Sequence, residues 1–188
     1  MKRKISIIGK SGSLASSLTA ELSATNQVTC YGKEQINMLV PESISSNIDN
    51  IKDSEVIIIC SGVLTGNVRD MLDINSSGPI QILSELKTAG SNAHVVIIGS
   101  HASTWTSWPG INIERLTYNV AKKTILEFAI GFEQADSSDL TLTVYNASRF
   151  DSNMNPGGMP IQQVVNNVSW IIDHENPPLV FENGKSKR

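Results

Sequence analysis

The first 24 residues constrain the fold more than any other part of the chain. Residues 4–9 form a short apolar run that ends on glycine, and a helical pattern follows as far as Leu22. This order predicts a strand, a glycine turn and a helix. Gly9 allows the chain to turn sharply, Gly12 allows a ligand to approach the backbone, and Ala15 is small enough for the helix to pack on the strand. Because a helix N-terminus attracts anions, the turn predicts a phosphate site.

The rest of the chain alternates strands with helices. We expect strands at 27–31, 55–60, 93–99, 139–145 and 179–181, and helices at 67–88, 114–134 and 161–174. A brief strand at 36–39, a short helix at 41–51 and a disordered basic tail at 184–188 complete the prediction. Such alternation is typical of an α/β fold with a doubly wound parallel sheet, a Rossmann-type three-layer sandwich, here in a single domain of residues 1–188.

Composition excludes several classes of protein. The chain is 40% hydrophobic and 18% charged, which is typical of a globular domain and not of a disordered chain. No apolar run approaches the roughly 20 residues of a spanning helix, and the basic residues 2–4 precede too short an apolar run for a signal peptide. The net charge of −3 gives no reason to expect nucleic acid. We therefore expect a cytoplasmic protein with no membrane or nucleic-acid partner.

The two cysteines, Cys30 and Cys60, each fall at the end of a predicted strand. We interpret them as buried, reduced thiols. No cluster of cysteine and histidine has the spacing of a metal site, so no metal is expected.

Polar residues follow most of the predicted strands. In a doubly wound fold the ligand lies over the carboxyl ends of the strands, so these residues are candidates for a binding site. They are Ser11, Lys33, Ser61, Ser100, His101, Asn146 and Ser148.

Tyr118 and Lys122 lie four residues apart and therefore on one face of the predicted helix 114–134. A free tyrosine has a pKa of about 10 and is a poor acid-base catalyst at neutral pH. A nearby cation lowers that pKa by about 1–3 units. The pair is thus a candidate general acid for a carbonyl or general base for an alcohol.

The order of these features resembles that of the short-chain dehydrogenase/reductase family. A glycine turn comes first, then Asn75 with Gly78, then a strand that ends in Ser100, and then Tyr118 with Lys122. The resemblance covers nearly the whole chain, including residues 181–184, which are similar to the family's last strand and its glycine. It implies an oxidoreductase that transfers a hydride between a nicotinamide cofactor and a small carbonyl or alcohol substrate.

The resemblance also implies a role for each site residue. Tyr118 would be the catalytic acid-base, Lys122 would bind the nicotinamide ribose and lower the tyrosine pKa, Ser100 would bind the substrate carbonyl, and Asn75 would hold a water in a proton relay. The expected cofactor-binding residues are Gly9, Lys10, Ser11, Gly12, Ser13, Leu14, Lys33, Asn37, Ser61, Gly62, Tyr118 and Lys122. Family members associate through their long helices, so a homodimer or homotetramer is expected through 67–88 and 114–134.

Charge after the second strand favours NADP over NAD. Members that bind NAD carry an acidic residue there, which would repel a 2′-phosphate. Here Gly32 and Lys33 follow the strand and are similar to the Gly-Arg of members that use NADP. Lys33, together with Lys10 and Ser11, would pair with the phosphate. The alternative is that Lys33 is a solvated surface lysine.

Two departures from the family pattern leave other functions open. The segment after the strand 55–60 keeps only Gly62 of the family's Asn-Asn-Ala-Gly, and Ala147-Ser148 replaces a Pro-Gly. A non-catalytic NAD(P)-binding sensor or regulatory protein on the same fold is the main alternative. An epimerase or dehydratase of nucleotide sugars is disfavoured, because such relatives carry a further substrate domain. Trp105 and Trp108 line a substrate wall or pack the loop onto the sheet, and His101 contacts substrate or is a turn residue.

Overall fold

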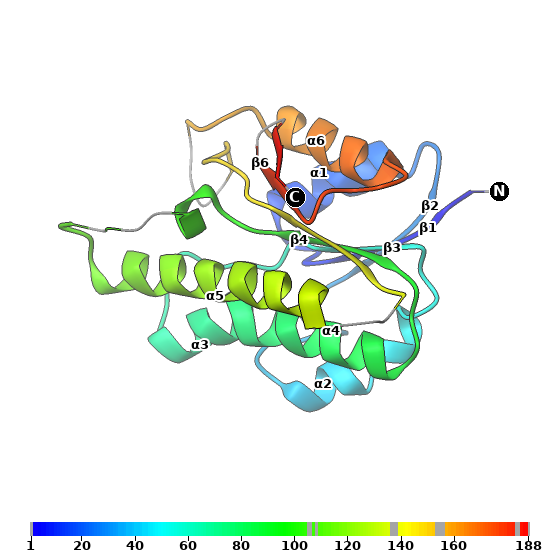
Figure 1. The fold of residues 1–188 in the computed structure, drawn as a ribbon, viewed down its shortest axis with the longest axis horizontal. Coiled ribbons are helices and arrows are strands. Elements are labelled where there is room, and N and C mark those ends of the chain that lie inside the picture. The colour runs from blue at the N-terminus through cyan, green and yellow to red at the C-terminus, as the bar shows by residue number, and fades with distance from the viewer. Residues whose placement is uncertain are drawn as a thin grey trace.

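A sheet runs through the centre of the molecule, with helices on both of its faces (Figure 1). The computed structural model describes residues 2–104, 107, 109–135, 139–152, 157–182 and 185–187. Within these residues the strands are β1 (Lys4–Ile8), β2 (Gln27–Tyr31), β3 (Val56–Ile59), β4 (His94–Ile98), β5 (Thr141–Tyr145), β6 (Val180–Glu182) and β7 (Lys185–Lys187).

The helices are α1 (Ser13–Leu22), α2 (Pro41–Ser45), α3 (Val68–Leu72), α4 (Gly78–Thr88), α5 (Ile113–Ala135) and α6 (Ile161–Asp173). Short 3-10 segments form η1 (Ile48–Asn50) and η3 (His101–Thr104), and a π-helical segment forms η2 (Asp73–Ser77). None of the described helices is both long enough and apolar enough to cross a membrane.

The order of the strands creates a crevice at one edge of the sheet. The strands follow the order β2-β1-β3-β4-β5-β6-β7, and every pair from β2 to β6 is parallel. The chain runs outward from β1 to β2 and then returns to β3 on the other side of β1. Ligands of doubly wound folds bind where the strand order reverses in this way, beyond the carboxyl ends of the strands. The predicted α/β fold with a doubly wound parallel sheet is therefore confirmed.

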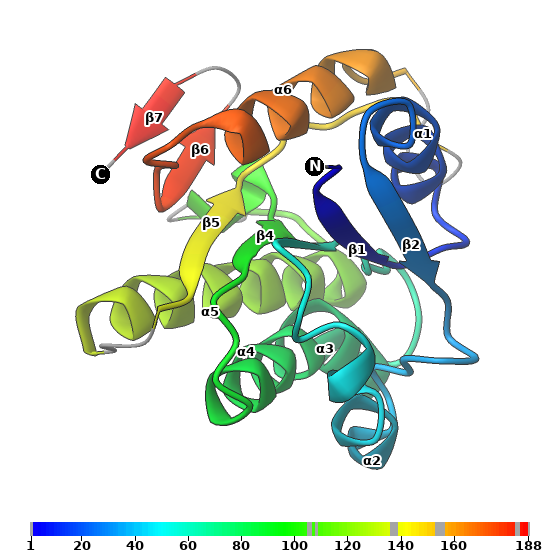
Figure 2. The same ribbon diagram turned by 90° about the vertical axis from the view of Figure 1, so that its right-hand side faces the viewer.

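Both faces of the sheet are buried, which explains the unbroken apolar runs of its central strands. In β3, Val56 and Ile58 face a core formed with α1 and α6, whereas Ile57 and Ile59 face a core formed with α2, α4 and α5. Figure 2 shows the two layers, with α1 and α6 above the sheet and α2, α3, α4 and α5 below it.

The predicted strand at 36–39 does not form. After β2 the chain makes a turn in which the carbonyl of Gly32 accepts hydrogen bonds from the backbone N–H groups of Gln35 and Ile36. Ile36 and Met38 are buried, but they pack on the core as part of a loop. The physical reason is length, because a parallel strand pair needs a crossover of about a dozen residues and only a few separate Tyr31 from Ile36. The predicted helix at 41–51 is broken into α2 and η1.

The predicted helix at 67–88 is one helical stretch with a π-helical segment in its middle. α3, η2 and α4 follow one another without a break, and the N–H of Gly78 bonds to the carbonyl of Asp73. Pro79 lies in the first turn of α4. Because proline has no N–H, the carbonyl of Asn75 lacks its usual donor four residues on.

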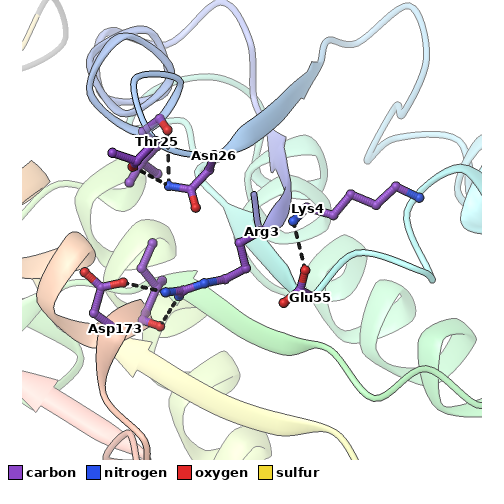
Figure 3. A network of polar contacts seen from close by, with 8 residues as sticks. Arg3, Lys4, Thr25, Asn26, Glu55 and Asp173 are labelled. Atoms are coloured by element: carbon purple, nitrogen blue, oxygen red, sulfur yellow. Dashed lines mark hydrogen bonds and ion pairs between the residues drawn. The ribbon is translucent and has the colours of Figure 1, made fainter. Parts of the chain in front are cut away.

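A polar network joins β1 to its neighbours at the edge opposite the crevice (Figure 3). The guanidinium of Arg3 donates to the carbonyl of Ile172 at 2.6 Å and to the carboxylate of Asp173 at 2.8 Å, which ties the end of α6 to the start of β1. The N–H of Lys4 donates to the carboxylate of Glu55 at 3.2 Å, just before β3. These contacts join the amino end of β1 to the end of α6 and to the start of β3.

The basic tail is also different from the expectation. Residues 185–187 form strand β7, which pairs antiparallel with β6, instead of being disordered. Backbone pairing with an exposed sheet edge does not depend on the side chains, so the basic composition did not reveal it. Asn183 and Gly184, which resemble the family's terminal glycine motif, lie outside the described residues.

His94 gives the fold a testable response to acid. Burial, aided by the charge of Arg3, lowers the pKa of His94 from about 6.5 to about 4, and its Nε2 lies 3.0 Å from Oγ1 of Thr143. The unfolded chain therefore binds a proton between these pH values that the folded chain does not, and stability is lost as pH falls from 6.5 towards 4. We predict that, in this pH range, the free energy of unfolding of the wild type falls more steeply with decreasing pH than that of His94→Gln. The difference in slope is up to about 1.4 kcal/mol per pH unit.

Urea denaturation of the wild type and the variant between these pH values measures the effect. His174→Gln, at the exposed end of α6, is the matched control and should keep the wild-type slope. Parallel curves for the wild type and His94→Gln would contradict the prediction.

Candidate functional site

Two adjoining cavities lie at the carboxyl edge of the sheet. The first, which we call the glycine-turn groove, has a volume of about 390 Å³ and follows the ends of β1, β2 and β3. The second, the tyrosine cavity, has a volume of about 380 Å³ and lies between the ends of β3, β4 and β5 and the first half of α5. Both are lined by Cys60, Ser61, Gly62, Ile98, Phe150 and Ser152. Because they share these walls, an extended ligand can reach from one into the other.

The glycine turn brings the backbone of β1 against that of β3. Gly9 has a φ of +117°, a conformation that side chains other than glycine rarely adopt. A Cβ atom at Gly9 would lie 3.1 Å from the backbone nitrogen of Ser61. The N–H of Gly9 bonds to the carbonyl of Tyr31, so the turn is also tied to β2. The predicted need for glycine at this position follows from both the conformation and the close approach.

The N-terminus of α1 faces the glycine-turn groove without a local partner. Gly12 is the N-cap residue and provides no side-chain hydrogen bond, and the first turn contains no acidic residue. Ser11, Gly12, Ser13 and Leu14 all line the groove. The first N–H groups of a helix have no partner within it, so this end can accept an anion.

Of the two lysines predicted to bind the phosphate, only one lines the groove. Lys33 and Asn37 line it, as expected for cofactor-binding residues. Lys10 does not line it: its side chain is exposed and lies 3.9 Å from the carboxylate of Glu34. An exposed pair of this kind contributes little to stability. Of the predicted phosphate ligands, the structure therefore brings Lys33 and Ser11 to the groove and leaves Lys10 outside it.

Tyr118, Ser100 and Lys122 meet in the tyrosine cavity. Tyr118 and Ser100 both line this cavity, and the Ser100 hydroxyl is one of the groups that lower the pKa of Tyr118. Nζ of Lys122 lies 5.9 Å from the centre of the Tyr118 ring and donates a hydrogen bond of 2.9 Å to the carbonyl of Ile98, at the end of β4. The serine after the strand and the tyrosine and lysine on the helix thus converge, as the sequence predicted.

Lys122 is a buried cation. Its side chain is 4% exposed, and burial lowers its pKa to about 8, an effect that the Cys60 thiol partly opposes. Burial also raises the pKa of that thiol. A lysine has three N–H donors, and Ile98 accepts one of them. Two donors therefore remain for a ligand.

The pKa of Tyr118 differs from our expectation. Burial raises it above the usual value, and this outweighs the hydrogen bond from Ser100 and the charge of Arg115, which lower it. Lys122 is not among the groups that set the direction. The expected lowering by Lys122 was therefore wrong for this arrangement, because removing the hydroxyl from water penalises the phenolate more than the charges nearby favour it.

Asn75 lies behind the cavities and lines neither of them. Its Nδ2 donates to the carbonyls of Val63 and Met71 at 2.8 Å, and its Oδ1 accepts from the N–H of Val63 at 3.2 Å. A Cβ at Gly62 would lie 3.2 Å from this Oδ1. The side chain therefore holds the segment after β3 against the helix, and its predicted part in a water relay stays a prediction.

Sequence reasoning missed several residues of the tyrosine cavity, among them Arg115, Asn119 and Phe150. Arg115 lies three residues before Tyr118, so helical spacing was a usable signal for it. Asn119 and Phe150 gave no such signal, because their place depends on how the helix and the loop after β5 pack.

Other predicted candidates are placed as follows. His101 and Ser148 line the tyrosine cavity, whereas Asn146 is buried beside it and accepts a hydrogen bond from Ser103. Trp105 and Trp108 lie outside the described residues. In the part of the chain that the structure describes, no cluster of residues has the composition of a metal site.

Comparisons with known proteins agree with this arrangement at the level of the fold. No protein-family model matches the sequence, and no curated protein sequence is significantly similar to it. Among solved structures, a short-chain dehydrogenase from Burkholderia cenocepacia in complex with NADP matches with a TM-score of 0.78 at 13% identity over 97% of both chains. The 3-alpha-hydroxysteroid dehydrogenase from a Pseudomonas species, complexed with NADH, matches with a TM-score of 0.78 at 16% identity over 96% of this chain and 95% of that chain.

A dehydrogenase/reductase from Sinorhizobium meliloti matches with a TM-score of 0.75 at 12% identity over 98% of this chain and 95% of that chain. At these identities the likeness concerns the fold. The protein has the fold of the short-chain dehydrogenases/reductases, and the resemblance predicted from the order of its motifs is confirmed at that level.

The buried Lys122 predicts a specific pH dependence of stability. Because its pKa is about 8 in the folded protein and about 10.4 in an unfolded chain, the unfolded state binds more protons between these values. The stability cost of burying the charge is therefore complete below pH 8 and is relieved as pH rises. We predict that the stability of the wild type relative to Lys122→Met rises by up to about 1.4 kcal/mol per pH unit in this window.

Chemical denaturation of both proteins across this window measures the difference. Lys123→Met removes a half-buried lysine from the same helix and should show no such trend relative to the wild type. A constant difference between the wild type and Lys122→Met would show that the folded protein does not shift this pKa.

Proposed function

We propose that the protein is an NADP-dependent oxidoreductase that transfers a hydride between nicotinamide and a small carbonyl or alcohol substrate, with Tyr118 as the general acid or base. One observation carries the proposal. Tyr118, Ser100 and Lys122 converge in a cavity that shares its walls with an anion-binding glycine turn. Solved structures of the same fold described as complexes with NADP or NADH support it.

The residues present fit a dinucleotide. The glycine turn has no side chain that would block a close approach of the ligand, and the uncapped N-terminus of α1 faces the groove without an acidic residue. Gly9, Ser11, Gly12, Ser13 and Leu14 would hold the diphosphate there. Ser61 and Gly62 line both cavities and would contact the middle of the cofactor. When bound, the nicotinamide supplies or accepts the hydride.

Lys33 supports the choice of NADP. Its exposed ammonium lines the groove just after β2, where a 2′-phosphate would lie if the diphosphate occupies the turn. Asn37 lies at the same end of the groove. Glu34 is the nearest acidic residue in sequence, and its carboxylate faces Lys10. An ammonium in the groove wall favours a phosphate over a free hydroxyl.

Tyr118 is suited to donate a proton. Because burial raises its pKa, the side chain is a neutral phenol at pH 7 and can protonate a carbonyl oxygen as negative charge develops there. Ser100 would donate a hydrogen bond to the same oxygen. The charge of Arg115 would then favour the phenolate that remains.

Lys122 would have two tasks. Its bond to Ile98 fixes the ammonium at the end of β4, and its remaining donors are free to bind ribose hydroxyls. A proton returning to Tyr118 would pass along this lysine and a water. The carbonyl of Asn75 lacks its usual helical donor because Pro79 has no N–H, and it is the group of Asn75 that would accept from such a water.

Three further expectations remain proposals about the whole protein. These are a single domain of residues 1–188, a cytoplasmic location, and a homodimer or homotetramer formed through α4 and α5.

Tyr118→Phe tests the proposed chemistry. The substitution removes one hydroxyl group and keeps the ring, so it should lower the rate of NADPH oxidation at least about 100-fold while the Kd for NADPH changes less than about threefold. Turnover is followed by NADPH absorbance with a panel of small aldehydes and ketones, and binding by NADPH fluorescence. A wild-type protein that binds NADPH but reduces nothing in the panel would favour the non-catalytic sensor. Full activity of the variant would exclude Tyr118 as the acid.

Lys33→Ala tests the cofactor preference. Loss of a charge-assisted contact should raise the Kd for NADPH about tenfold and leave the Kd for NADH within about twofold. Lys10→Ala removes a neighbouring charge that lies outside the groove and should change neither value. Equal affinity of the wild type for the two cofactors would contradict the choice of NADP.

A further inference from the structure

The walls of the tyrosine cavity carry more positive charge than hydride transfer requires. Besides Lys122, they include Arg115 and Arg149, and no aspartate or glutamate is among the described residues that line the cavity. A neutral carbonyl substrate would give these cations nothing to bind. The positive charge of the cavity wall therefore bears on the charge of the substrate.

Arg115 is the cation best placed to contact a substrate. It lies one helical turn before Tyr118 on α5, about 4.5 Å along the axis, and its charge is one of the groups that lower the pKa of Tyr118. Its guanidinium is therefore close to the hydroxyl that would meet the substrate carbonyl. The residue is exposed in the cavity wall, so a ligand can reach it.

No acidic side chain among the described residues neutralises Arg115. The ion pairs found there join Arg3 with Asp173, Lys10 with Glu34, Lys52 with Asp49, and Arg69 with Asp73. Two acids in the surrounding elements, Glu114 on the same helix and Asp151 after β5, have other contacts. Glu114 accepts from the N–H of Gly66, and Asp151 accepts from the N–H of Gly157. Arg115 is thus available to an anion from solution.

Asn119 gives an independent sign of a polar ligand in the same cavity. Asn119 follows Tyr118 in the sequence, lines the cavity and is fully buried. Neither Nδ2 nor Oδ1 of its side chain has a hydrogen-bond partner among the described residues. Buried amides in folded proteins nearly always have partners. A group that both donates and accepts, in the substrate or in a water that travels with it, would satisfy this side chain.

Arg149 and His101 extend the same wall. Arg149 already has another interaction. His101 is exposed and can donate a hydrogen bond.

We infer that the substrate is a carbonyl compound that carries an anionic group, a carboxylate or a phosphate, a few bonds from the carbonyl carbon, and that Arg115 binds this group. The inference rests on the proposed reductase function and names its substrate class. The planar guanidinium has paired N–H donors that match the two oxygens of a carboxylate or phosphate, and such pairs are stronger than bonds between neutral groups. Arg115 acts as a specificity residue, while Tyr118 keeps the proton chemistry.

Matched pairs of probes test the inference. Acetoacetate is compared with methyl acetoacetate, and dihydroxyacetone phosphate with dihydroxyacetone, so each pair differs by one anionic group next to a similar carbonyl. Binding is measured by isothermal titration calorimetry with and without saturating NADPH, and turnover by NADPH absorbance. We expect at least one anionic probe to bind and react at least about tenfold better than its neutral partner. The pair that shows this distinguishes a carboxylate from a phosphate.

Arg115→Gln should abolish that preference. We expect it to raise the KM of the preferred anionic probe about tenfold or more, to change the neutral probe less than twofold, and to leave the Kd for NADPH unchanged. Lys123→Gln removes one positive charge from the same helix outside the cavity and should behave as the wild type. Circular dichroism confirms that both variants are folded.

Three outcomes would overturn the inference. Neutral and anionic probes bound equally by the wild type would show that the cavity does not select charge. An equal effect of Arg115→Gln on both members of a pair, or a loss of NADPH affinity, would assign Arg115 to general binding or to the cofactor. If the wild type binds no NADPH, the proposed function fails separately, and the titrations without NADPH still decide whether Arg115 binds anions.

Discussion

The close approach of two backbones just beyond the ends of β1 and β3 is the constraint on which the site depends. Gly9, with its positive φ, brings the end of β1 so near to Ser61 that a Cβ would lie 3.1 Å from the Ser61 nitrogen. Ser61, which Gly9 approaches, lines both the glycine-turn groove and the tyrosine cavity. Any larger residue would push apart the strands whose ends form both walls. One steric condition therefore sets the position of the glycine turn relative to the end of β3.

The buried ammonium of Lys122 costs stability and gives the cavity its chemistry. A cation removed from water is expensive unless it is paired, and here the contact shown is a neutral carbonyl, that of Ile98. Such uncompensated groups in a cleft are typical of functional sites. The bond also joins α5 to the end of β4, so the lysine is positioned by the same strand whose end presents Ser100. Exclusion of water lowers the pKa of Lys122 and raises the pKa of Tyr118. The same burial therefore disfavours the ammonium of Lys122 and keeps Tyr118 protonated.

The segment after β3 shows how a departure from the expected motif is compensated. Of the family's pattern only Gly62 remains, yet Asn75 binds both backbone groups of Val63 and so holds this segment from the neighbouring helix. The π-helical turn and Pro79 place Asn75 for this task and leave its carbonyl without the usual donor. The loss of sequence similarity in the segment has therefore not removed the support for its conformation.

The sequence by itself determined the local elements and the residues that repeat along them. Apolar runs predicted β1 to β5, the two glycines predicted the turn, and the four-residue spacing predicted that Tyr118 and Lys122 share a helix face. It did not determine the direction of the Tyr118 pKa shift, the exclusion of Lys10 from the groove, the contributions of Arg115 and Asn119, or the pairing of β7. Only the tertiary structure decided these, because burial, charge and sheet-edge pairing depend on segments far apart in the chain, whereas periodicity reports the geometry of neighbouring residues.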